Sequence, residues 1–145
     1  MAKGGTYEAD LLKLLLNATA IANVADNAAG APLTNLSVAL HTADPGNGGN
    51  QTTNEATYTS YARVSVARSG AGWTITGTNP ASASPVATIS FPACTGGTNA
   101  ITHFSVGPTG GGATKIFYSG PVTPNISVSN GVTPQLTTAT TLTEQ

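Results

Sequence analysis

The stretch over residues 35–66 constrains the fold more than any other part of the chain. In residues 36–41 large apolar side chains alternate with serine, alanine and histidine, and a period of two marks a strand with one buried face. A second alternating run follows over residues 61–66. Between the two runs, residues 44–50 are a dense cluster of glycine, asparagine and proline, which signals a turn. The sequence therefore predicts a strand, a long loop over residues 42–60 and a second strand.

Further β runs follow, separated by glycine, proline and asparagine turns. We expect strands at residues 73–75, 86–91, 100–107, 115–119, 125–129 and 135–143. The last run is rich in threonine but keeps its alternation, so we interpret it as a strand and not as a loose tail. With about eight antiparallel strands at regular spacing, the pattern predicts a mainly β fold, a jelly-roll-like β-sandwich over residues 35–143. A length of 145 residues predicts a single domain, 1–145.

An N-terminal helix is predicted over residues 6–26. Thr6 is a suitable N-cap, and Glu8 and Asp10 suit the positive end of the helix dipole. Leucine, isoleucine and alanine then recur at spacings of three and four, which gives a broad apolar stripe. Two interpretations of this stripe remain open: it covers one face of the sheet, or it lies against a neighbouring subunit.

The charge composition excludes several classes of partner. Only 8% of the residues are charged and the net charge is −1, whereas soluble domains carry about 25% charged residues. Such a surface does not repel a neighbouring copy, so we expect a protein of an assembly; a monomer with a threonine-rich surface is the alternative. The five basic residues form no patch, which argues against nucleic acid. No apolar run approaches the roughly 20 residues that cross a bilayer, so we expect no membrane partner.

The single cysteine, Cys94, cannot form an intrachain disulfide, and we expect it to be a small buried side chain. We expect the chain to be made in the cytosol without export, because the leucine-rich run at residues 11–16 is short and contains Lys13.

Candidate chemistry is sparse. His41, Asp44 and Glu55 could be drawn together as a weak Ca²⁺ site, but that ion needs 6–8 oxygen ligands. We therefore interpret Asp44 as a turn former and His41 as the end of a strand, and expect neither a metal nor a cofactor. No serine stands in a Gly-x-Ser-x-Gly motif, and no other nucleophile pattern occurs. The sequence thus predicts a protein that is not an enzyme.

Three aromatic residues allow two interpretations. Tyr58, Tyr61 and Trp73 could form a platform on which a sugar stacks, or they could pack on the sheet or in a subunit contact. We favour packing.

Several short runs carry a resemblance to a known family. They lie at Leu40–Gly46 (LHTADPG), Gly49–Glu55 (GNQTTNE), Tyr58–Val64 (YTSYARV), Phe91–Gly97 (FPACTGG), Thr102–Phe104 (THF) and Tyr118–Gly120 (YSG). In these runs the chain resembles a family of small virion proteins encoded by tailed bacteriophages. The resemblance covers most of residues 36–120, and its first run is the most specific.

The resemblance implies a structural role in the virion. It favours a capsid cement (decoration) protein with a jelly-roll-like domain, which binds the outer surface of the shell and joins neighbouring major capsid subunits. The alternative is a tail or tail-fibre component, with binding to a host glycan as one variant. Broad, weakly charged surfaces and a long loop suit cementing, and self-pairing as a homo-oligomer, with a dimer favoured, would add multivalency. We expect the partner contacts in the long loop, at His41, Asp44, Pro45, Asn50, Glu55, Tyr58 and Tyr61.

Overall fold

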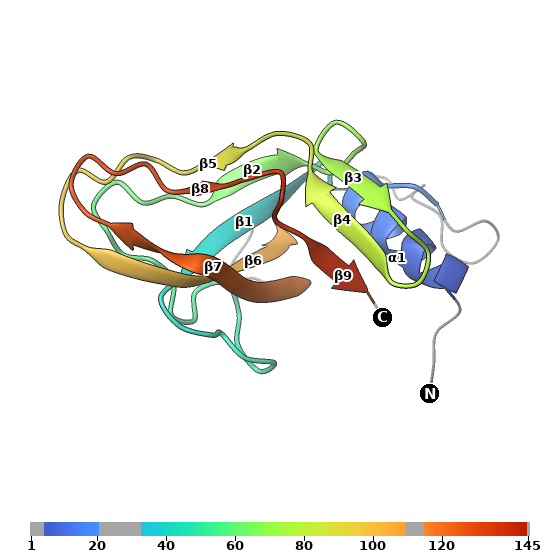
Figure 1. Cartoon of the computed structure of the whole chain (residues 1–145), viewed down its shortest axis with the longest axis horizontal. Helices are drawn as coiled ribbons and strands as arrows, with labels where there is room; N and C mark the ends of the chain where they lie inside the picture. Colours follow the sequence, from blue (N-terminus) through green and yellow to red (C-terminus); the bar gives the residue numbers. More distant parts are fainter. Residues whose placement is uncertain (1–4, 21–32, 110–114, 145) are drawn as a thin grey trace. The chain divides into compact units, whose positions relative to one another are not determined.

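The computed structural model describes residues 5–20, 33–109 and 115–144. Its elements are α1 (Gly5–Asn17), β1 (Asn35–His41), β2 (Val64–Ala67), β3 (Trp73–Thr76), β4 (Ala81–Pro85), β5 (Ile89–Ser90), β6 (Asn99–Pro108), β7 (Tyr118–Val128), β8 (Gln135–Leu136) and β9 (Leu142–Glu144). In these residues nine strands pair antiparallel and one helix precedes them (Figure 1). The prediction of a mainly β, antiparallel fold with an N-terminal helix is confirmed.

The chain divides into two compact units. Unit 1 comprises Met1–Asn35, Ala67–Thr88 and Thr137–Gln145, and unit 2 comprises Leu36–Val66 and Ile89–Leu136. Each unit contains segments that are distant in sequence, so the chain passes between the units several times. The prediction of a single domain over residues 1–145 stays a prediction.

Unit 1 is a helix packed on a small sheet. The sheet has the strand order β3-β4-β9, and α1 packs against it. Leu12 and Leu16 on the helix are fully buried, as are Ala81 and Ala83 of β4, while Trp73 is 2% exposed. Small alanines on the strand let the leucines of the helix come close. At least part of the apolar stripe of α1 is therefore buried within the chain.

Helix α1 ends earlier than predicted. The expected helix reached residue 26, but α1 stops at Asn17, and residues 21–26 lie outside the described part of the chain. Ala18 adopts a left-handed conformation with φ of 55°, which ends the helical hydrogen bonding. Arg68 then caps the last turn: its Nε donates to the carbonyl of Leu15 at 2.6 Å and its Nη2 to the carbonyl of Leu14 at 2.5 Å.

Unit 2 is built on a four-stranded sheet with the order β2-β1-β6-β7. The register of β1 and β6 runs from Leu36 opposite Pro108 to His41 opposite His103. Every residue of β1 after Asn35 is buried, which means that both faces of this central strand are covered. One face carries the apolar core of the unit, and the other carries Ser37 and His41.

Two of the predicted strand boundaries are wrong. The expected strands at residues 115–119 and 125–129 form one long strand, β7, in which Pro121 and Pro124 are tolerated because β7 is at the edge of its sheet. Conversely, the expected strand at residues 135–143 is two short strands: β8 pairs with β5 in unit 2, and β9 pairs with β4 in unit 1. A turn closed by the Thr140 amide and the Thr137 carbonyl separates them.

The remaining short strands also differ in detail. β4 lies in a stretch of alanine, serine and proline for which no strand was expected, and β5 is shorter than the expected strand at residues 86–91. Cys94 is 1% exposed, which confirms it as a buried side chain. No helix in the described ranges has the length and apolar character that a membrane crossing requires.

The Arg68 cap gives a first prediction. Arg68→Ala removes the donors to two helix carbonyls and should lower the free energy of unfolding by about 1–3 kcal/mol, because those carbonyls lose their partners in a part-buried setting. Arg68→Lys should recover only part of the loss, since an ammonium lacks the fork that reaches both oxygens. Urea unfolding measures both values.

Lys13→Ala is the matched control for the Arg68 variants. The Lys13 side chain is 44% exposed and its nitrogen is 4.0 Å from a carboxylate oxygen of Asp10, so we expect a change within about 0.5 kcal/mol. Equal losses for Lys13→Ala and Arg68→Ala would contradict the capping role.

Candidate functional site

The long loop over residues 42–60, which we call the contact loop, is anchored to the end of β1 by main-chain hydrogen bonds. The Thr42 amide donates to the Asn54 carbonyl at 2.8 Å, and the Ala56 amide donates to the Leu40 carbonyl at 2.9 Å. His41 and Glu55 form an isolated antiparallel bridge between these two bonds. The far half of the contact loop thus returns to β1 and pairs with it, while residues 43–50 project from the sheet of unit 2 (Figure 1).

A buried histidine lies at this anchor. His41 is fully buried, its Nδ1 is 2.8 Å from the carbonyl oxygen of Thr53, and its Nε2 is 2.7 Å from Ser105 Oγ. A carbonyl only accepts, so Nδ1 carries the proton and Nε2 accepts from the serine hydroxyl. Burial lowers the pKa of His41 below its ordinary 6.5, although the carbonyl of Thr53 and the charge of Glu55 partly oppose that shift. At neutral pH the ring is therefore uncharged.

Gln51 extends the network over the polar face of β1. Its side chain is fully buried and its Nε2 donates to the Ser37 carbonyl at 2.9 Å, with Ser105 Oγ at 3.5 Å. Gly107 leaves space for it: a methyl group there would be 2.9 Å from Gln51 Cδ and would collide with the carbonyl oxygen of Lys115. The contact loop thus covers the second face of β1 with polar atoms that are hydrogen-bonded.

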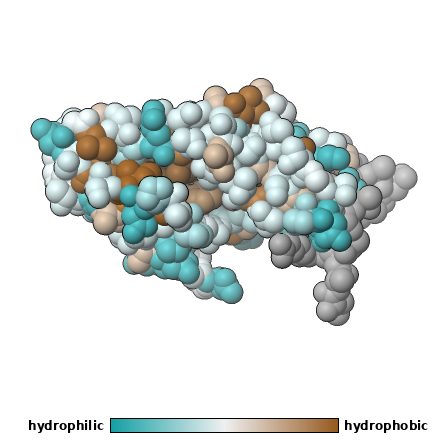
Figure 2. All heavy atoms as spheres, viewed as in Figure 1, coloured by the Kyte–Doolittle hydropathy of each residue, from teal (hydrophilic) through white to brown (hydrophobic). Residues whose placement is uncertain are grey.

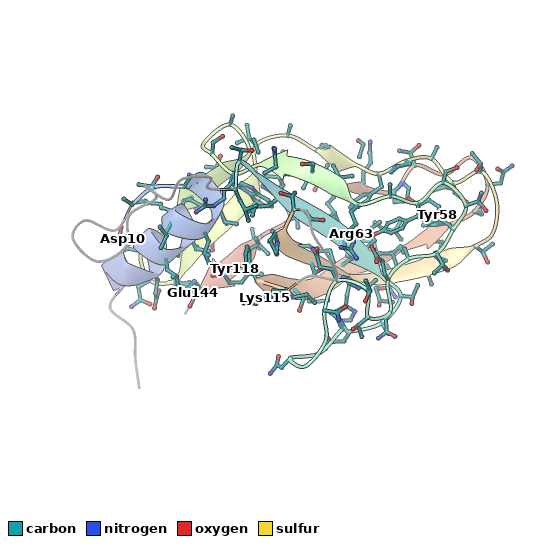
Figure 3. All side chains as sticks on the ribbon, turned by 180° about the vertical axis from the view of Figure 1, so that it is seen from behind. Asp10, Tyr58, Arg63, Lys115, Tyr118 and Glu144 are labelled. Carbon is teal, nitrogen blue, oxygen red and sulfur yellow. The ribbon has the colours of Figure 1, made fainter. Side chains whose placement is uncertain are left out.

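An ion pair closes the network. Arg63 Nε and Nη2 donate to the two carboxylate oxygens of Glu55 at 2.6 and 2.8 Å, a bidentate arrangement. Arg63 Nη1 also donates to Gln51 Oε1 at 3.3 Å. The pair is largely shielded, with the Arg63 and Glu55 side chains 25% and 17% exposed, and the hydrogen bond to Glu55 raises the pKa of Arg63. Arg63 lies over the sheet of unit 2 in Figure 3.

Tyr61 joins the ion pair to the backbone of β1. Its hydroxyl donates to Glu55 Oε1 at 3.1 Å and accepts from the Leu40 amide at 3.0 Å. Burial is the main reason why the pKa of Tyr61 is raised well above its ordinary value. The ring also contacts Tyr58 edge to face at 5.3 Å and stacks on Phe91 at 6.4 Å. One side chain therefore belongs both to the polar network and to an aromatic cluster.

The projecting part of the contact loop is shaped by its own side chains. Asp44 Oδ1 accepts from the Gly46 amide at 2.8 Å, and Asn50 Oδ1 accepts from the Thr52 amide at 2.8 Å. These are the turns that short polar side chains favour. Asp44, Asn47 and Gly48 are exposed.

The structure separates the seven predicted contact residues into two groups. Three belong to the hydrogen-bonded network, namely His41, Glu55 and Tyr61, and two others, Tyr58 and Pro45, are buried. Asp44 is exposed and Asn50 is half-buried in the projecting part. Their role in binding a partner stays a prediction. The structure adds three network members that the sequence did not single out, Gln51, Arg63 and Ser105; a signal for two of them was their place in the GNQTT and YARV runs.

The described residues offer neither a metal site nor an exposed aromatic platform at Tyr58 and Trp73. In the described ranges, no group of three histidine, cysteine or acidic side chains is placed to hold a metal ion. Tyr58 and Trp73 are 3% and 2% exposed, so neither offers a ring face to a sugar. The packing interpretation is confirmed for Tyr58 and Trp73, and the ring of the half-buried Tyr61 contacts Tyr58 and Phe91.

The chain was compared with known proteins. A family model described as "Podophage GP4 fiber I protein gp80" matches residues 10–143. A search of curated proteins found no match. The match spans the contact loop and strands β1 to β8, and it ends within β9.

The ion pair gives a second prediction. Glu55→Ala should lower the free energy of unfolding by about 1–3 kcal/mol, because it removes the bidentate acceptor of a shielded guanidinium and the acceptor of the Tyr61 hydroxyl. Thermal or urea unfolding measures the loss. Asp44→Asn is the control: it keeps the oxygen that accepts from the Gly46 amide, and we expect it to lie within about 0.5 kcal/mol of the parent. The anchoring role fails if the two variants are equally stable.

The packing around Gly107 gives a third. Gly107→Ala should destabilise unit 2 by at least about 1 kcal/mol, since the added methyl group overlaps a carbonyl oxygen and the Gln51 side chain. Gly120→Ala on β7 is the matched control, because its methyl group would meet Phe104 Cε1 at an ordinary 3.6 Å. Urea midpoints should separate the two variants, and a Gly107→Ala protein as stable as Gly120→Ala would contradict the arrangement.

Proposed function

Because the chain belongs to the podophage GP4 fiber I protein gp80 family, it is a structural protein of a phage virion, and we propose that it serves as a component of the fibre. The family match carries this proposal. It is a family of structural fibre proteins and not of enzymes, in line with the absence of a catalytic pattern in the sequence.

The fibre role replaces the capsid cement interpretation as the favoured one. The description of the matching family names a fiber protein, which supports the tail-fibre alternative better than attachment to a shell. Binding to the major capsid protein and self-association as a dimer stay predictions. Binding to a host glycan through Tyr58 or Trp73 finds no support in their burial.

The proposed means of attachment is the projecting part of the contact loop, residues 43–50. The network beneath it holds the loop in one conformation, so little conformational entropy is lost when a partner binds. The exposed residues of this part are Ala43, Asp44, Gly46, Asn47 and Gly48, whose backbone and short polar side chains suit hydrogen bonding to another protein.

The sparse charge of unit 2 supports contact with other protein. Unit 2 contains four charged side chains, Asp44, Glu55, Arg63 and Lys115, and two of them pair with each other. The face shown in Figure 2 has mostly intermediate hydropathy, with small teal and brown patches. A nearly uncharged polar surface costs less desolvation than a charged one when a neighbour covers it, provided that its polar groups find hydrogen-bond partners across the interface.

A matched pair of glycine substitutions tests this proposal. Gly48→Arg places a long charged side chain on the projecting part of the contact loop, and Gly70→Arg places one on an exposed turn of unit 1; a Cβ at either position meets open space. Both proteins should fold. We expect Gly48→Arg to reduce incorporation into virions at least tenfold, because a charge is forced into the interface, and Gly70→Arg to leave it unchanged.

Quantitative mass spectrometry of purified particles measures incorporation, and antibody labelling in the electron microscope locates the protein. A fibre component should be present in few copies and labelled at the fibre. Labelling spread over the shell would overturn the fibre role, and equal incorporation of the two arginine variants would overturn the role of the contact loop.

A further inference from the structure

In the series of hydrogen bonds around His41, the donor and the acceptor of each bond are fixed by the groups at its ends. A guanidinium only donates and a carbonyl only accepts, so Arg63 Nη1 at Gln51 Oε1 and Gln51 Nε2 at the Ser37 carbonyl fix the orientation of the Gln51 amide. The same Gln51 Nε2 also faces Ser105 Oγ. The serine proton is therefore directed to His41 Nε2.

At the end of this chain His41 donates from Nδ1 to the Thr53 carbonyl, which lies in the contact loop. The ring thus joins β6, through Ser105, to the contact loop, through Thr53. The arrangement requires an acceptor at Nε2, and a histidine has one only in its neutral form. The network is satisfied only while His41 is uncharged.

Protonation would break the chain at its centre. A proton on Nε2 would meet the oxygen of Ser105, toward which Gln51 already directs an N–H group, and the serine proton would need a new acceptor in a buried place. The imidazolium would also carry its charge at a site with no solvent exposure.

The neighbouring charges do not compensate for this. The residues with an electrostatic influence on the ring are Glu55 of the contact loop, Arg63 before β2 and His103 of β6. Arg63 and His103 disfavour a positive charge, whereas Glu55 favours it. However, both oxygens of the Glu55 carboxylate are already engaged by Arg63, and one also accepts from Tyr61.

We propose that His41 is an acid-sensitive latch: the contact loop is closed on β1 while the imidazole is neutral, and acidification opens it. The latch is a property of unit 2 alone. Its use to release a bound partner in acid rests on the proposed function of the contact loop.

The direction and size of the effect follow from linkage. With a lowered pKa in the closed loop and an ordinary 6.5 in the open loop, the open form binds more protons, so closure is fully stable above pH 6.5 and weakens as the pH falls below it. Between pH 7.5 and pH 5 the population of the open loop should rise by up to about 30-fold, the ratio set by the proton affinity of an ordinary histidine.

Amide hydrogen exchange by NMR on the isolated protein is the test. After correction for intrinsic exchange, the Thr42 and Ala56 amides should exchange about ten- to thirtyfold faster at pH 5 than at pH 7.5. The Phe91 amide, which donates to the Pro134 carbonyl elsewhere in unit 2, should change less than twofold. Equal protection of Thr42 and Ala56 at the two pH values would overturn the latch, as would an equal change at Phe91.

The chain has two histidines, and they lie opposite each other on β1 and β6, which provides a matched control. His41→Asn keeps a donor for the Thr53 carbonyl but cannot be protonated, so the pH dependence should disappear. The His103→Asn protein should keep the pH dependence of exchange at Thr42 and Ala56. The reverse pattern would assign the effect to His103 and overturn the proposal.

A second measurement keeps the proposal testable if His41→Asn does not fold. The ¹⁵N shifts of the His41 ring in the parent protein should show a proton on Nδ1 and none on Nε2 at pH 7.5. A proton on Nε2 at that pH would overturn the latch. Neither readout involves the virion, so failure of the latch and failure of the fibre assignment are distinguishable.

Discussion

The pairing of Glu55 with Arg63 is the interaction on which the polar side of unit 2 depends. A loop of nineteen residues, 42–60, has little apolar material to bury, and its backbone would otherwise be free in water. The ion pair, with Gln51 and Tyr61 on either side of it, closes the loop onto β1. Since each partner is also hydrogen-bonded to a third group, the pair is shielded without leaving its polar atoms unmatched, which is the condition for a buried polar network to be tolerated.

This arrangement explains why β1 is covered on both faces. Its alternation predicts one apolar face, and Leu36, Val38 and Leu40 supply it. The opposite face, with Ser37 and His41, has the composition of a solvent-facing surface. The contact loop supplies hydrogen-bonding partners in place of water there, so polar side chains take core positions.

The sequence was sufficient for the features that local pattern controls. Alternation in residues 36–41 and 100–107 located β1 and β6, because successive side chains of a strand point to opposite faces in any sheet. Prediction from alternation failed where the same local pattern occurs in more than one kind of structure. Threonine alternation in residues 135–143 is typical of a strand, yet a turn divides the segment between two sheets. Strict alternation also places Ile101 and Phe104 on opposite faces of β6, yet both are buried, so alternation did not reveal that this inner strand is covered on both faces. The polar network joins residues up to 64 positions apart, and spacing cannot reveal such contacts.

The two prolines of β7 have a consequence for how copies of this protein can meet. An uncharged edge strand of eleven residues would ordinarily be a template for another strand, and proteins crowded into a growing particle would be exposed to that hazard. Pro121 and Pro124 have no N–H group to offer along this edge. The two prolines therefore interrupt strand addition along this edge, which favours contacts through side chains and loops over stacking of chains into a continuous ribbon.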